Sequence, residues 1–473
     1  MLSCAMRTHH TSVVLQLVLL LCCSTVIATA QTFRYVVHDQ DHIPASVHKE
    51  RRERVLASLP NNTAAVVFSA DVRNRQNDVD YEYRQNSDML YLTGIPTPTA
   101  TLVLIPKGVT IGQRTVREVV FIRARSQDRE QWEGVSMGPR EVMEMHGIDT
   151  AIVIDSMQKF LDSLVTSIDT LLVTSLPTKS LTVPLAGKNV YANSEIRKWA
   201  KERNPNLVVS QRLSGLVAFR EVKDTAELRL MQRAIDISIE GHYAMMRGAR
   251  PGMKEYELEA LMEYHFKRGG AEDVGYASIV GSGYNACILH YSTNRRPTVN
   301  GDLVLADCGA EYHGYTADIT RTFPMNGNFS REQRLLYDVV LEAQDSGIAA
   351  SRVGESFREP HNAAKRVIAR RLMELGVITK LEQLGKYFMH GTSHYLGLDV
   401  HDPCSYGPLK ANSVITVEPG IYIPEGSDCE LKWWNIGIRI EDDILITPNG
   451  PVNMSAKLVR TADEIEAIVG NAP

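Results

Sequence analysis

Five side chains of types that commonly bind metal ions are spaced through the last third of the 473-residue chain: Asp307, Asp318, His394, Glu418 and Glu441. Four of them are carboxylates and one is an imidazole. Four acidic groups gathered at one point would repel each other strongly unless cations lay between them. An oxygen-rich set with one nitrogen suits a pair of hard or borderline divalent ions, and manganese fits it better than a closed thiolate zinc site would. The pattern therefore predicts a hydrolase that uses two metal ions.

The first two of these residues flank a turn-rich segment, residues 310–315. If that hairpin is centred between Tyr312 and His313, Asp307 and Asp318 lie directly opposite each other. Directly opposite residues have Cβ atoms about 4.5–5.5 Å apart. The two metals of a hydrolytic pair are about 3.5–4 Å apart, so the two carboxylates could hold both ions. The alternative is that they are two unrelated surface aspartates.

The remaining carboxylates also lie on strand-like segments. Glu418 ends an apolar run just before Pro419-Gly420 turns the chain, and Glu441 shares one strand face with Arg439. A polar edge strand would explain either glutamate alone. Two glutamates directed from strand ends towards a pair of aspartates are better explained by a metal site.

Four histidines cluster near these carboxylates in the sequence: His290, His390, His394 and His401. A single histidine is more often a packed or surface residue than a ligand. Here the glycine at 391 allows a close backbone approach beside two of them. We therefore expect the cluster to contribute to the site.

The elements that must position these residues fall into two groups. Before about residue 190, short apolar strands alternate with helices, which indicates a mixed α/β domain. The strands are expected at 64–68, 100–105, 118–122 and 170–173, and the helices at 47–59 and 156–167.

After residue 213 the pattern changes to long helices and paired strands. Helices are expected at 225–246, with Asp224 as the cap, and at 255–268, 331–350 and 357–375. Strands are expected at 302–307, 316–322, 413–418 and 436–447. Strand pairs joined by turns favour a mostly antiparallel sheet covered by helices on one side. The overall class is α+β, with domains at 31–190 and 213–473 and a linker over 191–212.

The first thirty residues have the features of an export signal. Arg7 precedes an apolar run, residues 13–27, and Ala28-Thr29-Ala30 offers a cleavage site before Gln31. The run is short for a spanning helix, which needs roughly 20 apolar residues. We expect a periplasmic or secreted protein with no stable membrane span after cleavage. Anchoring through this segment is the alternative.

Charge and cysteine content limit the other possibilities. The formal charge of −5 comes without any basic block, which argues against a nucleic-acid partner. Four cysteines remain after the predicted leader, and no CxxC pair occurs. They do not form a disulfide scaffold, although one bridge is possible in an oxidising compartment.

Several segments together resemble a known family. Residues 307–324, 390–402, 418–420 and 437–441 are similar to the successive motifs of the Xaa-Pro peptidases that have the pita-bread fold, and Arg220-x-x-Lys223-x-x-x-Glu227 resembles the start of that catalytic domain. The block Tyr83-Arg84-Gln85-Asn86-Ser87-Asp88 resembles the amino-terminal domain of aminopeptidase P in particular. The likeness covers nearly all of the chain after the predicted leader.

The resemblance implies a role for each residue of the site. Asp307 would bind one metal, Asp318 and Glu441 would bridge both, and His394 and Glu418 would complete the other shell. A metal-bridging hydroxide would attack the scissile carbonyl, with Glu418 transferring the proton. The residues His290, His390, His401 and Arg439 would line the substrate site.

The implied activity is release of the amino-terminal residue from peptides with proline in second position. An X-Pro bond has no N–H and a ring that restricts its neighbour, so it needs a site shaped around that ring. An Xaa-Pro dipeptidase is the close alternative. The short interval from Glu418 to Glu441 and the serine before His394 favour the aminopeptidase.

Two further expectations concern partners. A non-catalytic pita-bread binding protein is the alternative from another class, but such relatives typically lack one or more of the five ligands, all of which are present here. We also expect a homo-oligomer, a dimer or a tetramer. After Trp132-Glu133-Gly134 this chain has Val135-Ser136, where many aminopeptidases P carry arginine. An inter-subunit contact taken from the family is therefore not supported at that position.

Overall fold

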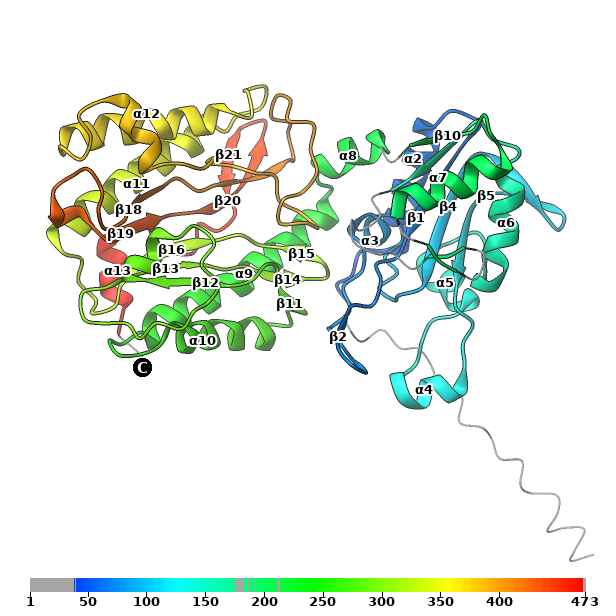
Figure 1. Ribbon diagram of the computed structural model, residues 1–473, viewed down its shortest axis with the longest axis horizontal. Helices are drawn as coiled ribbons and strands as arrows, with labels where there is room; N and C mark the ends of the chain where they lie inside the picture. Colours follow the sequence, from blue (N-terminus) through cyan, green and yellow to red (C-terminus); the bar gives the residue numbers. More distant parts are fainter. Residues whose placement is uncertain are drawn as a thin grey trace, which may run out of the picture.

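The computed structural model describes residue 38 and residues 40–174, 183–185, 188–190, 192–210 and 213–470. The predicted export signal, residues 1–30, lies outside this part and stays a prediction. Within the described residues, no helix has the length and apolar character needed to cross a membrane. The chain forms two domains that lie side by side and are joined through helix α8 (Ser214–Glu221) (Figure 1).

The amino-terminal domain is built on a six-stranded mixed sheet in the order β10-β7-β1-β4-β5-β6. Its central strand β1 (Thr63–Phe68) is antiparallel to β4 (Ala100–Ile111) and parallel to β7 (Thr170–Val173). The remaining strands of the sheet are β5 (Arg114–Ile122), β6 (Ala151–Val153) and β10 (Val208–Ser210). The strands predicted at 64–68, 100–105, 118–122 and 170–173 are confirmed, and β4 and β5 extend several residues beyond their predicted bounds.

Helices cover both faces of this sheet because alternate residues of β1 point to opposite sides. Ala65 and Val67 pack with α2 (Ala45–Ser58), α3 (Ser87–Thr93) and α5 (Pro139–His146). Val66 and Phe68 pack with α6 (Met157–Leu164) and α7 (Ala192–Arg203). The smaller elements of this half are β2 (Asn74–Gln76), β3 (Val79–Asp80), α4 (Gln127–Glu133), β8 (Val183–Leu185) and β9 (Lys188–Val190).

The structure corrects the predicted linker at 191–212. Helix α7 packs on the amino-terminal sheet, and β10 pairs in parallel with β7, so most of this segment belongs to the amino-terminal domain. The segment is polar and has no clear hydrophobic periodicity, so the sequence did not indicate the short edge strand β10. Its partner strand, β7, lies about forty residues earlier in the sequence. Residues 191, 211 and 212 lie outside the described part.

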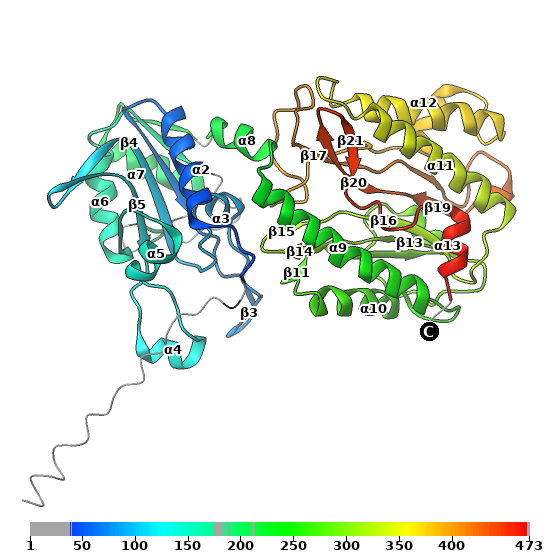
Figure 2. The ribbon, with the colours of Figure 1, turned by 180° about the vertical axis from the view of Figure 1, so that it is seen from behind.

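Helices of the carboxy-terminal domain, residues 213–470, cover one face of its strands. Helices α9 and α11 lie behind the strands in Figure 1 and in front of them in Figure 2. Asp224 caps α9 as predicted, because its carboxylate accepts hydrogen bonds from the backbone amides of Ala226 and Glu227. The helices are α9 (Thr225–Gly248), α10 (Glu255–Arg268), α11 (Arg331–Ala350), α12 (Glu359–Glu374) and α13 (Ala462–Ile468).

The strands of this domain form several small antiparallel sheets, with the orders β12-β13-β16, β11-β14-β15, β17-β20-β21 and β18-β19. Their bounds are β11 (Asp273–Val274), β12 (Ile279–Ser282), β13 (Leu303–Asp307), β14 (Ala310–Tyr312), β15 (Tyr315–Thr316), β16 (Thr320–Pro324), β17 (Val414–Val417), β18 (Gly420–Ile423), β19 (Ile436–Arg439), β20 (Asp442–Thr447) and β21 (Gly450–Asn453). The antiparallel arrangement agrees with the prediction. Two predicted strands, 316–322 and 436–447, are each interrupted.

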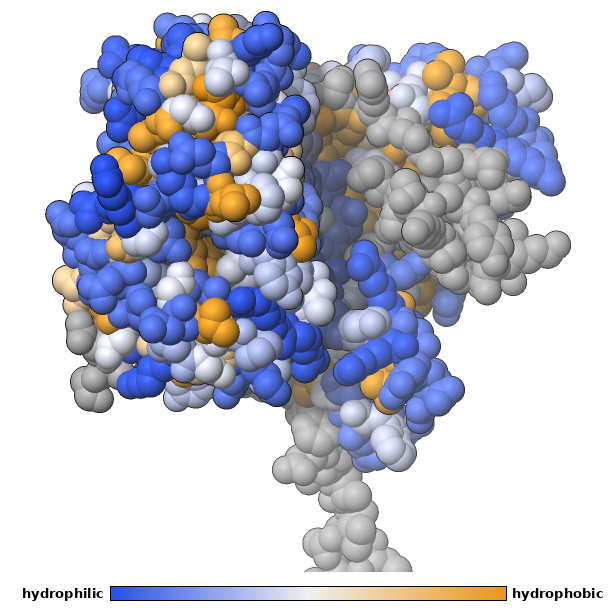
Figure 3. Space-filling model, turned by 60° about the vertical axis from the view of Figure 1, so that its left-hand side comes forward, coloured by the Kyte–Doolittle hydropathy of each residue, from blue (hydrophilic) through white to orange (hydrophobic). Residues whose placement is uncertain are grey.

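The outer surface of the carboxy-terminal domain carries both hydrophobic and hydrophilic side chains. Figure 3 shows hydrophobic side chains in several groups among mostly hydrophilic ones on one of its faces. Single exposed apolar residues such as Leu431 are ordinary on folded proteins.

Candidate active site

The predicted metal ligands lie where strands of the carboxy-terminal domain end or are interrupted. Asp307 is the last residue of β13, and Glu418 directly follows β17. Asp318 lies in the break between β15 and β16, and Glu441 lies in the break between β19 and β20. A break lets the backbone turn a side chain out of the regular alternation of a strand. Both interrupted strands therefore deliver a carboxylate to the same place.

His394 comes from an extended segment that runs beside β17. The backbone amide of Thr416 donates to the His394 carbonyl oxygen over 2.9 Å, and the amide of Glu418 donates to the Thr392 carbonyl oxygen over 2.9 Å. These bonds place the His394 imidazole near Glu418, with 3.7 Å between Nε2 and Oε1. The imidazole is also 3.3 Å from the Asp318 carboxylate.

Three of the predicted ligands form one compact group. Each of Asp318, His394 and Glu441 offers a ligand atom, and these atoms all lie within 4.8 Å of one another. Glu418 adjoins this group through His394. Asp307 adjoins it through the hydroxyl of Tyr276, which is 2.6 Å from a carboxylate oxygen of Asp307 and 2.6 Å from one of Asp318. The fold thus brings all five predicted ligands to one site.

The predicted hairpin register is wrong. Tyr312 pairs with Tyr315 and Asp307 with Thr320, so the turn is centred between His313 and Gly314, one residue later than expected. Asp307 and Asp318 are therefore diagonal rather than direct neighbours across the hairpin. A diagonal pair is separated by about 7–8 Å at the backbone, and here the Tyr276 hydroxyl lies between the two carboxylates.

Arg439 lies beside the ligands, as predicted. Its guanidinium donates to Asp307 over 2.6 Å, to the Tyr422 hydroxyl over 2.8 Å and to the Thr320 hydroxyl over 3.1 Å. The same Tyr422 hydroxyl is 2.9 Å from Nε2 of His390. Arg439 is almost completely buried, so it provides a fixed positive charge at the edge of the carboxylate group.

The three other histidines also lie at this site. The ring of His401 packs edge-on against the ring of His394, with 4.4 Å between the centroids. Burial, followed by repulsion from Arg439, lowers the pKa of His390 to about 4, and repulsion from His290 acts in the same direction. His290 also contributes to the lowered pKa of His401, after burial and repulsion from His394. His290 is exposed, which suits contact with a ligand from solvent.

The acidic side chains are too crowded to be ionised together without cations among them. Burial, followed by repulsion from Asp318 and Glu418, raises the pKa of Glu441 well above its ordinary value. Burial also raises the pKa of Glu418 and of Asp307. A divalent cation would reverse this preference, because it stabilises the ionised carboxylates. The donor set, four carboxylates and one imidazole, fits hard or borderline divalent ions.

Comparison with known proteins places this geometry in a family. The model of metallopeptidase family M24 matches residues 229–448, and that of the aminopeptidase P amino-terminal domain matches residues 48–173. The Xaa-Pro aminopeptidase of Escherichia coli (strain K12) is 37% identical, over 89% of this chain and 97% of that protein. The Xaa-Pro aminopeptidase of Haemophilus influenzae is 36% identical, over 90% and 98%. This chain belongs to the Xaa-Pro aminopeptidase family of M24 metallopeptidases.

Solved structures of this family have the same fold. The aminopeptidase PepP of Pseudomonas aeruginosa superposes with a TM-score of 0.82 at 34% identity and covers 91% of this chain and 98% of its own. Aminopeptidase P of E. coli with the inhibitor Pro-Leu gives 0.82 at 36% identity, over 90% and 98%. The expected architecture, an aminopeptidase P-type domain followed by a pita-bread catalytic domain, is confirmed.

Reasoning from sequence missed three hydroxyl groups of the site. Tyr276 lies between two ligands, the Thr320 hydroxyl donates to Glu441 over 2.7 Å, and Tyr422 lies between Arg439 and His390. Thr320 could have been found, because it lies two residues after Asp318 in the strand predicted at 316–322, where both would share one face. Tyr276 could not, since its segment lies outside the hairpin and no local pattern marks it.

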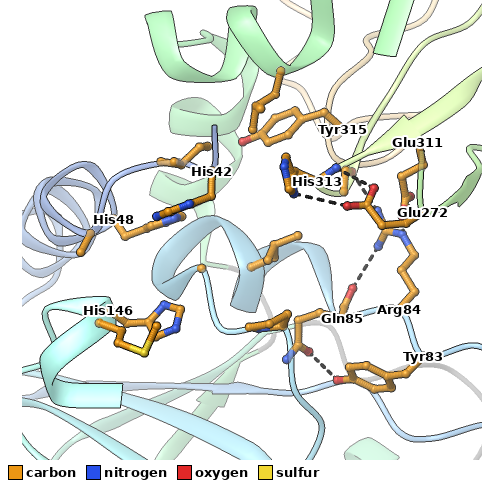
Figure 4. Close-up of a pocket in the computed structure, with 18 of the residues that line it drawn as sticks. His42, His48, Tyr83, Arg84, Gln85, His146, Glu272, Glu311, His313 and Tyr315 are labelled. Carbon is orange, nitrogen blue, oxygen red and sulfur yellow. Dashed lines mark hydrogen bonds and ion pairs between the residues drawn. The ribbon is translucent and has the colours of Figure 1, made fainter. Parts of the chain in front are cut away.

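A cavity of about 460 Å³ lies between the two domains and is separate from the metal ligands. Figure 4 shows His42, His48 and His146 on one side of it and Arg84, Glu272, Glu311 and His313 on the other. His313, at the tip of the β14–β15 hairpin, is 3.3 Å from Glu272 and 3.1 Å from Asp41. The tip of the hairpin that leads to Asp307 and Asp318 thus rests against the amino-terminal domain.

Proposed function

We propose that the protein is an aminopeptidase that removes the first residue from peptides with proline in second position, and that it works with two divalent ions, natively manganese. The observation that carries this proposal is the convergence of Asp318, His394 and Glu441 within 4.8 Å, with Asp307 and Glu418 adjoining. The relatives named Xaa-Pro aminopeptidase support the substrate class.

The chain's own residues divide the work of peptide hydrolysis. Two bound divalent ions would supply Lewis-acid chemistry, which acidifies a water molecule and polarises the scissile carbonyl. Glu418 would accept a proton from the attacking water and pass it to the leaving proline nitrogen. His390, His401 and His290 hold the substrate carbonyl and stabilise the oxyanion.

Arg439 holds the ligand group in place and supplies a positive charge beside it. Its contacts with Asp307, Thr320 and Tyr422 fix the end of β19 against the ligands. A peptide with proline in second position offers no N–H at the scissile bond. Recognition therefore has to come from the shape of the site and from the carbonyl oxygen, which His290, His390 and His401 would bind.

The test combines metal analysis with a matched substrate set. Purified protein should contain two metal ions per chain, lose activity on chelation and regain it best with Mn²⁺. Arg-Pro-Pro should release arginine, whereas Arg-Ala-Pro should be cut far more slowly and an amino-terminally acetylated peptide should resist. Glu441→Gln should remove activity while the circular dichroism spectrum stays that of the wild type.

Two outcomes would contradict the proposal. Full activity in protein shown by elemental analysis to be metal-free would exclude the two-metal mechanism. Better cleavage of Xaa-Pro dipeptides than of Xaa-Pro-Yaa peptides would assign the protein to the dipeptidases instead.

A further inference from the structure

The loop at 397–402 carries His401 to the ligand group but has little structure of its own. Its backbone is attached to the catalytic domain at two points: the amide of Asp402 donates to the Tyr395 carbonyl oxygen over 2.9 Å, and the amide of Thr316 donates to the Gly397 carbonyl oxygen over 3.0 Å. His401 itself is exposed. Side-chain contacts must therefore fix much of the position of its ring.

The amino-terminal domain supplies several of those contacts. The hydroxyl of Ser87, in the first turn of α3, donates to the Asp399 carboxylate over 2.6 Å. The guanidinium of Arg84 donates to the carbonyl oxygen of Leu398 and, over 2.7 Å, to the Glu311 carboxylate of β14. Figure 4 shows Arg84 and Glu311 on the same side of the inter-domain cavity. The sequence block that resembles aminopeptidase P thus touches both the loop and the hairpin of the site.

An ionic network with a buried centre completes the attachment. Arg220, just after the start of the catalytic domain, donates to Asp88 of α3 over 2.7 Å and to Asp399 and Asp402 of the loop over 2.8 and 2.5 Å. Lys223 donates to Asp402 over 2.7 Å. Two cations and three carboxylates therefore join α3, the segment 220–223 and the loop at 397–402. Both carboxylates of the loop flank His401.

We infer that Ser87 and Asp88 of the amino-terminal domain are positioning residues for His401, acting through Asp399 and Arg220. This inference rests on the proposed function, in which His401 holds the substrate. A displacement of a catalytic group by about 1 Å can lower the rate a hundredfold. The amino-terminal domain would then contribute to catalysis although none of its described residues contacts a predicted metal ligand.

The variant Ser87→Ala tests the inference because it removes one hydroxyl and adds no charge. The hydroxyl donates to Asp399 and accepts from Arg84. Its removal should lower kcat/KM on Arg-Pro-Pro by roughly 10- to 150-fold, the range for a hydrogen bond to a charged group. Metal content should remain that of the wild type. Ser167→Ala is the matched control, since the Ser167 hydroxyl donates to the Leu164 carbonyl oxygen, within the amino-terminal domain.

A double-mutant cycle separates positioning from general destabilisation. In the His401→Ala background, Ser87→Ala should change kcat/KM by less than about twofold, because the group it positions is gone. Asp88→Asn provides a second variant of the same volume. In this variant the positive charges of Arg220 and Lys223 are still neutralised by Asp399 and Asp402, so the protein should fold. Its effect on kcat/KM should likewise be lost in the His401→Ala background.

Hydrogen exchange gives a readout that does not depend on activity. Backbone amides of 397–402 should exchange faster in Ser87→Ala than in the wild type, and Ser167→Ala should show no change. Equal effects of Ser87→Ala with and without His401, or unchanged exchange in the loop, would overturn the positioning role. Failure of the metal-loaded wild type to cut Arg-Pro-Pro would overturn the proposed function, while the exchange comparison would still decide whether Ser87 holds the loop.

Discussion

At the scale of single residues, the site depends on the hydroxyl of Tyr276, which lies between the carboxylates of Asp307 and Asp318. Burial, followed by repulsion from Asp307 and Asp318, raises the pKa of Tyr276 well above its ordinary value, so the phenol keeps its proton. That proton can serve only one of the two carboxylates at a time. Tyr276→Phe should therefore weaken metal binding by about 10- to 100-fold, as is usual for groups that orient ligands.

This prediction is checked by titrating metal-free protein with Mn²⁺ and following binding by calorimetry. Tyr337→Phe is the matched control, because the Tyr337 hydroxyl donates to the Arg460 carbonyl oxygen and contacts no predicted ligand. Unchanged affinity in Tyr276→Phe would show that the carboxylates are oriented without the phenol.

At the scale of elements, the hairpin between β13 and β16 depends on a glycine. A Cβ atom at Gly309 would lie 1.8 Å from the Ala317 carbonyl oxygen, which is far inside van der Waals contact. Gly309→Ala should push Asp318 away from Asp307 and lower both metal affinity and activity. The free energy of unfolding should fall by about 1–3 kcal/mol, the usual cost of overpacking.

Metal titration and urea unfolding of the same samples measure both effects. Gly385→Ala is the control, since a Cβ at Gly385 meets no atom within 4 Å. If Gly309→Ala bound metal as the wild type does, the close packing of this hairpin would not be what sets the ligand spacing.

At the scale of the whole molecule, the amino-terminal domain holds histidines that stay neutral. Burial lowers the pKa of His146 to about 4, although its ring also bonds the Thr93 carbonyl oxygen. The unfolded chain binds a proton near pH 6.5 and the folded chain does not, so stability is complete above pH 6.5 and falls as the pH drops towards 4. At about 1.4 kcal/mol per unit, the loss due to His146 amounts to at most about 3 kcal/mol.

Urea unfolding at several pH values between 7 and 4 measures this slope. His146→Gln cannot take up the proton, so its stability should fall less steeply over the same range. An equal slope in the two proteins would show that His146 is protonated in the folded state.

Much of the architecture was predictable because it depends on neighbours in sequence. The helices at 255–268 and 331–350 have the bounds expected from apolar spacing and from their ends, and Asp224 caps α9 through its own next residues. The five predicted ligands were recognisable by type, because few other functions bring four carboxylates and an imidazole together. These features depend on residue types and on neighbours in sequence, so the tertiary structure does not alter them.

Tertiary structure decided what depends on residues far apart in the chain. The predicted turn centre was wrong by one residue, so Asp307 pairs with Thr320 instead of Asp318. A turn centre follows from the packing of both strands and not from the symmetry of two aspartates. Part of the predicted linker belongs to a sheet because β10 pairs with the edge of β7, a strand that lies about forty residues before it in the sequence. Tyr276 reaches Asp307 and Asp318, and Ser87 reaches Asp399, only through the fold. The sequence determined which groups could do chemistry, and long-range packing determined the distances between them.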